Sequence, residues 1–194
     1  MSAYLGQAAV FLVETAFGIY ILMVLLRLLF QLVRADFYNP FSQFLVRLTN
    51  PPLLPLRRIV PGLGGIDVAS IILLLALQVL KLFLVVLING YAATPIGMVV
   101  LSLAQLLELT VWVFLIAIFV RIILSWIAPH SHHPMTALLI SLTEPLMRPA
   151  RRLLPPISGL DLSPIIVLIL LQLTLMLLVQ PLTDLGVALI RQSF

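Results

Sequence analysis

The sequence from Leu48 to Asp67 reads LTNPPLLPLRRIVPGLGGID, and it recurs from Leu142 to Asp161 as LTEPLMRPARRLLPPISGLD. The two copies are offset by 94 residues (142 minus 48), align without a gap and share the pattern LTxPxxxPxRRxxPxxxGxD. Besides two arginine pairs, the pattern repeats five structural positions: Pro51, Pro55, Pro61, Gly65 and Asp67, and then Pro145, Pro149, Pro155, Gly159 and Asp161. A motif of this length that occurs twice indicates a duplicated structural unit.

The duplication extends beyond the motif. At the same offset the chain repeats an acidic, a basic, a proline and an amide position: Glu14 and Glu108, Arg27 and Arg121, Pro40 and Pro134, Gln78 and Gln172. Only 9% of the residues are charged, so composition alone does not readily produce such matches. We infer a tandem repeat over about residues 8–89 and 102–183, which divides the chain into units 1–97 and 98–194.

The composition is that of an integral membrane protein. The 194-residue chain is 62% hydrophobic, whereas soluble domains are about half apolar and about a quarter charged. A membrane-spanning helix needs about 20 residues, and four apolar segments suit this length: about residues 8–33, 68–88, 98–127 and 162–180. The predicted fold is therefore all-α, a polytopic membrane protein with four transmembrane helices.

The stretch between the two spans of each unit is predicted to have two parts. A short amphipathic helix begins at Pro40, and its counterpart covers about Met135–Thr143; both are too short to span a membrane, so we expect them at the interface. A Pro/Arg-rich segment follows, in which the prolines rule out a long regular helix and favour a kinked conformation. Asp67 is expected to cap the helix that begins at Val68, and Pro181 to end the fourth span.

Arginine is distributed unequally between the two sides of the predicted membrane protein. The loops after the first and third spans lie on one side of the membrane and carry Arg34, Arg47, Arg57, Arg58, Arg148, Arg151 and Arg152. The other side carries only Arg191. Short arginine-rich loops stay in the cytoplasm, so we predict cytoplasmic motif copies, periplasmic termini and parallel repeats. Arg27 and Arg121 lie near the cytoplasmic ends of their spans, which permits their side chains to snorkel to the interface.

The motif arginines, Arg57, Arg58, Arg151 and Arg152, leave two interpretations open. They determine topology only, or they bind anionic lipid headgroups or an acidic membrane-protein partner, because the flanking prolines fix their spacing. A nucleic-acid role is not expected, since four arginines without a stacking platform give little phosphate affinity. The sequence leaves a homo-oligomer open.

Three ionisable groups lie in the outer half of the predicted spans: Glu14, Lys81 and Glu108. Charged groups at this depth are costly and often functional, so they form either structural pairs or part of an ion or proton pathway. We predict that Lys81 pairs with Glu108 or Glu14, preferably Glu108, with Gln78 one turn away on the same face. The alternative is that Lys81 snorkels outward to the headgroups.

Candidate metal and catalytic residues are few. His130, His132 and His133 lie in a hinge loop without the cysteines or the nearby acid pair that would complete a zinc site, so we expect neither a metal nor a cofactor. The chain has no cysteine, which excludes disulfides and thiolate ligands. No Ser-His-Asp set or phosphate-cradling glycine loop is visible, and we expect no enzymatic activity.

The doubled motif, each copy between a pair of apolar segments, resembles the YggT/YlmG family of small bacterial membrane proteins in its two-unit form. The resemblance covers nearly the whole chain and implies a multi-pass protein of the bacterial inner membrane. It associates bacterial members with cell-division gene neighbourhoods or osmotic stress tolerance, and plastid members with nucleoid distribution and assembly of a membrane cytochrome. It implies no catalytic residue. The second copy departs from the first at Pro156 and Ser158, which replace Gly62 and Gly64.

Two functional hypotheses follow from these features. The first is a non-enzymatic membrane scaffold or assembly factor, whose Pro-Arg segments form a cytoplasmic platform for anionic lipid or a membrane-protein partner. The second is a small ion transporter or channel that uses the intramembrane charged residues. A hydrated cavity lined by Glu14, Lys81 and Glu108 would favour the second hypothesis, whereas a closed pair inside a dry bundle would favour the first.

Overall fold

The computed structural model describes residues 3–127, 133–153 and 161–191, which form helices and connecting loops without a β-strand. In chain order the elements are α1 (Ala3–Leu32), α2 (Pro40–Ile59), α3 (Val68–Asn89), α4 (Pro95–Ile127), α5 (Pro134–Leu153), α6 (Ser163–Thr174), the π-helical turn η1 (Leu175–Val179) and α7 (Gln180–Arg191). Within these ranges four segments are long and apolar enough to cross a membrane: α1, α3, α4 and the continuous α6–η1–α7. The prediction of an all-α protein with four spans is confirmed.

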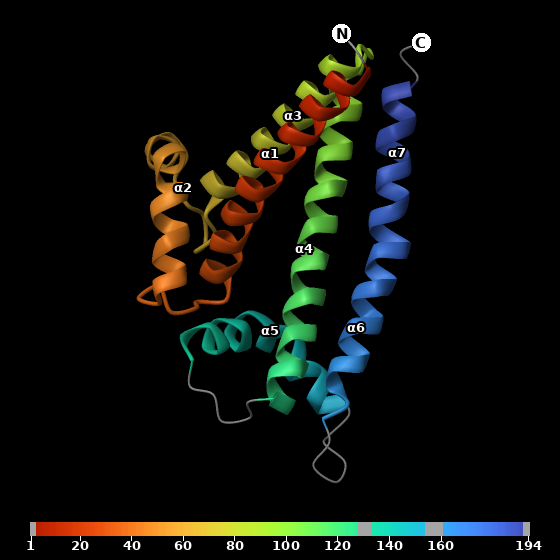
Figure 1. Cartoon of the computed structure of the whole chain (residues 1–194). Coiled ribbons are helices and arrows are strands. Elements are labelled where there is room, and N and C mark those ends of the chain that lie inside the picture. Colours follow the sequence, from red (N-terminus) through yellow and green to blue (C-terminus); the bar gives the residue numbers. More distant parts are fainter. Residues whose placement is uncertain (1–2, 128–132, 154–160, 192–194) are drawn as a thin grey trace.

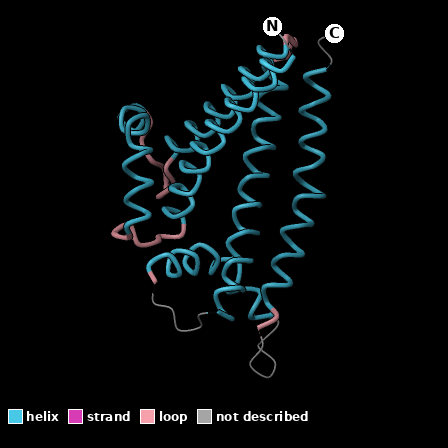
Figure 2. The backbone as a smooth tube through the Cα atoms, in the orientation of Figure 1, coloured by secondary structure: helices cyan, strands magenta, loops and turns pink. Residues whose placement is uncertain are grey.

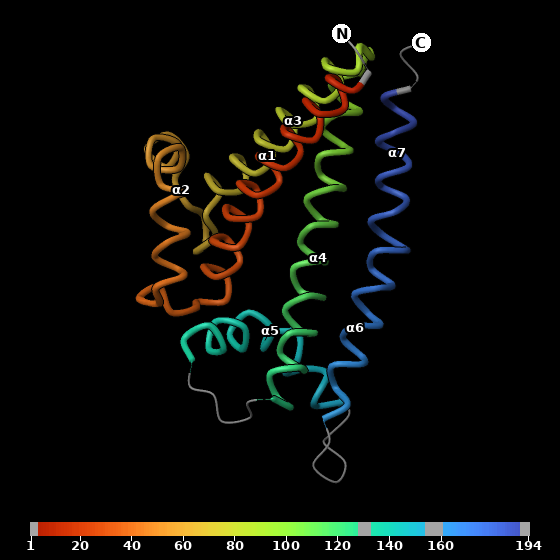
Figure 3. Tube along the Cα trace, viewed as in Figure 1, coloured from red at the N-terminus to blue at the C-terminus, as the bar shows by residue number. Residues whose placement is uncertain are grey.

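The four long segments run alternately in opposite directions. Figure 1 shows α1 and α4 starting at the end of the molecule that carries both chain termini, and α3 and α6–α7 returning to that end. The trace in Figure 3 likewise brings the N-terminal and C-terminal helices to the same end. Helix α1 packs against α3, helix α4 packs against α6 and α7, and α3 and α4 join the two units. The two units therefore share one orientation, as parallel repeats do.

Helices α2 and α5 each follow the first long helix of their unit. Helix α2 contacts α1 and α3, while α5 contacts α4 and α6 and also reaches α1 of the other unit. An apolar core lies where these helices meet, and its buried residues include Val24, Leu28, Leu45, Leu138 and Leu142. Because lipid tails are as apolar as leucine, close packing rather than removal of surface from water holds such a core together in a membrane.

Helix α3 begins and ends at residues suited to these positions. Asp67 is its N-cap, and the Asp67 side chain accepts a hydrogen bond from the backbone N–H of Ser70. This bond satisfies one of the donors that every helix start leaves free. Gly90 ends the helix with φ at 73°, a left-handed conformation that costs glycine little. The predicted start of this span at Val68 is confirmed.

The Pro/Arg-rich segment is helical, and the prediction that its prolines exclude a long helix was wrong. Both α2 and α5 contain internal prolines: Pro51, Pro52 and Pro55 in α2, and Pro145 and Pro149 in α5. Each proline removes one N–H donor and crowds one carbonyl a turn earlier. In α2 these losses fall in one short stretch, so the helix bends there instead of ending; Figure 2 shows its tube changing direction. Leu53, between the prolines, is completely buried and anchors the bend.

The fourth span also continues where the sequence predicted an end. Pro181 lies near the start of α7, and the helix runs on to Arg191. Immediately before the proline, the backbone N–H of Gln180 donates to the carbonyl of Leu175, five residues earlier instead of the usual four. This wider π-helical turn changes the hydrogen-bond register where the proline ring would crowd a carbonyl. The helix therefore accommodates Pro181.

Helices α4 and α7 approach each other closely at two glycines. A Cβ atom on Gly97 would lie 2.7 Å from Cγ1 of Ile190, and one on Gly186 would lie 2.9 Å from Cα of Leu101. Neither position has room for a side chain unless a neighbour moves. Small residues that let backbones approach are enriched at membrane helix interfaces, so these glycines set the packing of the last helix against α4.

Candidate functional site

Arg27, near the end of α1, is held inside the protein. The residue is only 5% exposed, and its Nη1 donates a hydrogen bond of 2.6 Å to Oγ1 of Thr49 on α2. The Thr49 hydroxyl donates in turn to the carbonyl of Leu45 at 2.7 Å. The guanidinium is therefore bound between two helices, instead of snorkelling to the interface as the sequence permitted.

Arg57, at the end of α2, binds the aspartate that caps α3. Its Nε donates to Oδ2 of Asp67 at 3.2 Å, and its Nη2 contacts the same oxygen. Asp67 also accepts hydrogen bonds from the backbone N–H and the hydroxyl of Ser70. Burial raises the pKa of Asp67, but the hydrogen bonds from Arg57 and Ser70 and the charge of Arg57 outweigh burial and hold this pKa below its usual value. The carboxylate is thus ionised at neutral pH.

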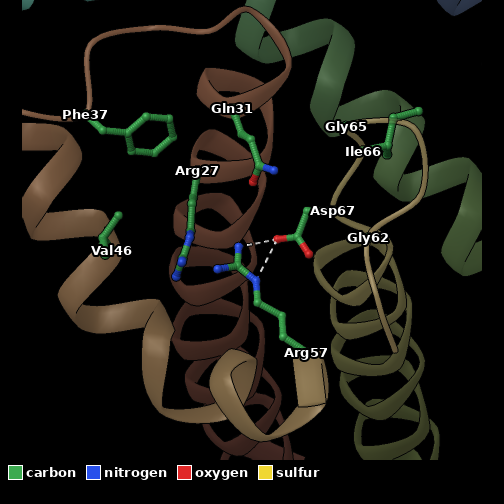
Figure 4. Close-up of a pocket in the computed structure, with 9 residues that line it drawn as sticks. All are labelled: Arg27, Gln31, Phe37, Val46, Arg57, Gly62, Gly65, Ile66 and Asp67. Carbon is green, nitrogen blue, oxygen red and sulfur yellow. Dashed lines mark hydrogen bonds and ion pairs between the residues drawn. The ribbon is translucent and has the colours of Figure 1, made fainter. Parts of the chain in front are cut away.

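These groups line a single pocket of about 600 Å³ whose wall includes Arg27, Gln31, Arg57 and Asp67. Figure 4 shows the two guanidinium groups and the carboxylate coming together from α1, from the end of α2 and from the loop before α3. The positive charge of Arg57 repels the positive charge of Arg27, whereas the negative charge of Asp67 attracts it. Three charged groups from three elements are therefore concentrated in one place.

A pocket of the same construction occurs in the second unit. Nη1 of Arg121 donates to Oγ1 of Thr143 at 2.7 Å, and Nε of Arg151 donates to Oδ2 of Asp161 at 3.0 Å. Burial raises the pKa of Asp161, but hydrogen bonds from Ser163 and Arg151 outweigh burial and lower this pKa below its usual value. The second pocket has a volume of about 620 Å³. The duplicated sequence thus builds the same arrangement twice.

One acid distinguishes the two pockets. Glu144 accepts a hydrogen bond from Nη2 of Arg121 at 3.2 Å and another from Nη1 of Arg151 at 3.0 Å. It therefore bridges both arginines of the second pocket. The corresponding residue of the first unit is Asn50, a neutral amide. The first pocket places two arginines against one aspartate, whereas the second balances two arginines with two acids.

The structure separates the two members of each motif arginine pair. Arg57 and Arg151 bind the motif aspartates, whereas Arg58 and Arg152 are exposed. The sequence pattern does not distinguish these roles, because adjacent arginines look equivalent until the helix bearing them is placed against its neighbours. The second arginine of each pair forms no ion pair with an acid in the described part of the chain.

The remaining predicted motif residues have structural positions or lie outside the described residues. Pro61 and Gly65 lie in the loop before α3, where Gly65 has a positive φ of 84°. Four positions of the second copy fall outside the described residues: Pro155, Pro156, Ser158 and Gly159.

Sequence reasoning missed the threonine partners Thr49 and Thr143, and also Glu144. A signal for the threonines was present, because each follows its arginine by 22 residues in both units. No comparable signal marked Glu144, which breaks the repeat.

The preference for Glu108 as the partner of Lys81 was wrong. Among the described residues, no salt bridge joins these two side chains. Within the same part of the chain no salt bridge joins Lys81 to Glu14 either, although α1 packs against α3. Gln78 is buried and donates a hydrogen bond to Gln105 of α4. These contacts connect the helices in a way that the chain order did not predict.

Of the three histidines, only His133 belongs to the described residues. It lies directly before α5, and its Nδ1 accepts a hydrogen bond of 3.2 Å from the backbone N–H of Met135. His130 and His132 lie outside the described residues. The described residues contain no group of three histidine, cysteine, aspartate or glutamate side chains that could hold a metal ion.

The fold and its pockets define a class of protein: a polytopic α-helical membrane protein built from two copies of a two-span unit, each with an internal pocket of arginine, threonine and aspartate. The family model CCB3/YggT matches residues 6–88 and 100–182, one match in each unit. The chain belongs to the CCB3/YggT family.

Several relatives match along most of their length. An uncharacterised protein of Pseudomonas aeruginosa is 46% identical over 177 residues, which cover 90% of each chain. An uncharacterised protein of the proC 3' region of Vibrio alginolyticus is 44% identical over 168 residues, covering 84% of this chain and 88% of the relative. The uncharacterised protein YggT of Escherichia coli K12 is 41% identical over 165 residues, covering 83% of this chain and 84% of the relative. A comparison with solved structures gives no match. The resemblance to the two-unit form of the family is thus confirmed.

Proposed function

We propose that this chain is a non-enzymatic scaffold or assembly factor of the bacterial inner membrane, with both termini in the periplasm. Its arginine-rich end then faces the cytoplasm and binds anionic lipid headgroups or an acidic segment of a membrane-protein partner. The family resemblance directs the search for the process to cell division, osmotic stress tolerance or assembly of a membrane complex.

The observation that carries this proposal is a set of exposed arginines on the helices and turn that surround the two pockets. They lie in the turn after α1, on α2 and on α5: Arg34, Arg47, Arg58, Arg148 and Arg152. None of them forms an ion pair with an acid among the described residues. A basic residue near an anionic leaflet contributes about 1 kcal/mol of attraction, so together they favour an anionic surface or partner.

The pockets bear on the alternative function, a small ion transporter or channel. Neither arginine pocket is lined by Glu14, Lys81 or Glu108, and the apolar pocket between α1, α4 and α5 does not include them either. Glu14 is exposed, and the amide of Gln78 is bonded to that of Gln105. The described pockets therefore lend no support to a hydrated path through these charges, and the scaffold has the better support.

Lipid retention by the purified protein tests the proposal. Arg47, Arg58, Arg148 and Arg152 are exposed, so changing all four to Gln should leave the helical packing intact. Native mass spectrometry of detergent-purified protein titrated with phosphatidylglycerol or phosphatidylcholine counts the bound lipids. We expect the wild type to prefer phosphatidylglycerol and the fourfold variant to lose most of this preference. An unchanged preference at low ionic strength would leave the exposed arginines as topology determinants only.

A photo-crosslinking residue at position 58 or 152, used in native membranes, tests the partner side of the proposal. Because both side chains are exposed, a protein bound to this surface should be captured at both positions. The matched control is the same residue at Leu12, which is exposed on the first half of α1, far along the chain from the arginines. Capture of the same proteins from Leu12 would show that crosslinking follows abundance in the membrane rather than binding at the arginines.

A further inference from the structure

The first pocket carries a positive charge that the protein does not balance. Arg27 and Arg57 face a single acid, Asp67. In the second pocket Arg121 and Arg151 are matched by Glu144 and Asp161. The two pockets have the same origin and similar volumes, about 600 and about 620 Å³, so the second shows how this fold accommodates a negative group beside the two guanidinium groups.

Arg27 is the pocket arginine that forms no ion pair with an acid among the described residues. A guanidinium has five N–H donors, and among the described residues Thr49 is the hydrogen-bond partner of Arg27. The acid of the pocket is already engaged, because Asp67 accepts from Arg57 and from Ser70. Arg27 is nevertheless 95% buried, as it is 5% exposed. The guanidinium of Arg27 lines the pocket, so its remaining donors are available to an anion that enters it.

Asn50 explains why the first unit supplies no second acid to its two arginines. The corresponding Glu144 approaches Arg121 and Arg151 at 3.2 and 3.0 Å. An amide at position 50 carries no negative charge, so the first unit lacks the carboxylate that engages both arginines of the second unit. The pocket also contains Gln31, whose side-chain amide is a further donor. Two guanidinium groups and an amide form a donor set suited to a phosphate group, since guanidinium binds phosphate in bidentate fashion.

We propose that the pocket of the first unit binds a phosphate group, held by Arg27, Arg57 and Gln31, and that Asn50 leaves these arginines available where Glu144 engages their counterparts. The phosphate belongs to an anionic lipid headgroup or is free inorganic phosphate. The lipid source rests on the proposed function, which places this end of the protein at an anionic leaflet. The pocket differs from the exposed arginine surface because its donors converge on one hollow from three elements, so it should take one ligand at a defined site.

Reciprocal exchange of the distinguishing residue tests the proposal. Asn50→Glu introduces the acid of the second unit into the first pocket, where it should occupy Arg27 and Arg57 and close the site. Glu144→Asn does the reverse and should open a second site at Arg121. Each variant introduces the residue that the other unit already carries at the equivalent position of its helix, so both variants should fold. A thermal melt in detergent checks that they do.

Two probes distinguish the sources of the phosphate. Inorganic phosphate is titrated into detergent-purified protein and followed by its ³¹P signal, and phosphatidylglycerol is titrated with phosphatidylcholine as control and counted by native mass spectrometry. The wild type should also bind phosphatidylglycerol at its exposed arginines, so the variants are compared with it. We expect Asn50→Glu to bind at one site fewer, with about tenfold or more weaker binding there, because a carboxylate at hydrogen-bonding distance competes for the same donors. We expect Glu144→Asn to bind at one site more. Binding of inorganic phosphate identifies a free anion, and binding of phosphatidylglycerol alone identifies a lipid headgroup.

The proposal is overturned if wild type and Asn50→Glu bind both probes equally, or if neither probe binds the wild type. Equal binding would leave the proposed function intact as long as the fourfold exposed-arginine variant still loses its lipid preference, whereas a wild type that binds no phosphatidylglycerol would contradict both proposals. Conversely, a single phosphate site that disappears in Asn50→Glu would stand even if the exposed-arginine variant behaved like the wild type. The two sets of variants share no residue, so the two proposals can fail independently.

Discussion

The arginine–aspartate pair occurs twice in different surroundings, which allows its strength to be predicted from burial. The side chains of Arg57 and Asp67 are 35% and 5% exposed, whereas those of Arg151 and Asp161 are 31% and 37% exposed. Removing one partner of a buried pair costs about 3–5 kcal/mol, because the other charge is left buried and unpaired. Since Arg57 is itself one-third exposed, we expect Arg57→Gln to lower the free energy of unfolding by about 2–3 kcal/mol. An exposed pair contributes about 0–1 kcal/mol, so Arg151→Gln should cost about 1 kcal/mol or less.

Denaturation in a mild detergent, followed by circular dichroism, measures both losses under the same conditions. Arg151→Gln is the matched control, because it removes the same side chain from the same position of the motif. It also leaves Glu144 bonded to Arg121. Equal losses in the two variants, or a larger loss in Arg151→Gln, would refute the argument that burial of the aspartate sets the cost.

The pair also predicts a pH dependence whose sign follows from the pKa of Asp67. This pKa lies below its usual value in the folded protein, so the unfolded chain binds the proton first as the pH falls. The stabilising contribution is therefore fully present above the ordinary carboxyl pKa of about 4 and is lost as the pH falls through the lowered value. In Arg57→Gln the charge that lowers the pKa of Asp67 is removed while burial remains, so this pKa moves up toward or above its value in the unfolded chain, and the loss of stability at acid pH should shrink or disappear. Asp67→Asn, as control, should abolish this contribution.

Three further predictions concern packing, pairing and topology. Gly97→Ala should lower the free energy of unfolding by about 1–3 kcal/mol through overpacking, since the new Cβ would lie 2.7 Å from a neighbouring atom. Gly18→Ala is the control: it has open space around it and should not destabilise the protein in the same detergent melt. Lys81→Met and Glu14→Gln should be non-additive by about 0.5–1 kcal/mol; strict additivity would mean that these charges do not interact. A reporter fused at Phe194 should read as periplasmic, and a cytoplasmic reading would reverse the proposed orientation.

Much of the fold could be predicted along the chain because it depends on local properties. The four spans follow from apolar length, and the helix start at Val68 follows from the capping chemistry of Asp67, which its bond to Ser70 confirms. The proline positions failed as predictors of helix ends. Propensity describes an isolated helix, whereas here the buried Leu53 and the π-helical turn before Pro181 compensate for the lost bonds.

The candidate site could be predicted only in part. The repeat singled out Arg27, Arg57 and Asp67 as positions that matter, because each has a counterpart 94 residues later. It did not reveal that these three side chains line one pocket. Arg27 belongs to the first span and Asp67 to the loop before the second, and α2 brings Arg57 between them.

The chain on its own therefore specified what can be read from neighbours in sequence: an all-helical membrane protein, its spans, its duplicated unit and the asymmetry of its arginines. The partners of individual side chains depended instead on how far each helix rotates, tilts and bends against the others. Thus Arg27 binds Thr49 and Gln78 binds Gln105, whereas the described residues show no salt bridge between Lys81 and Glu108. Rotation and tilt result from packing between helices distant in sequence, and no local pattern encodes them.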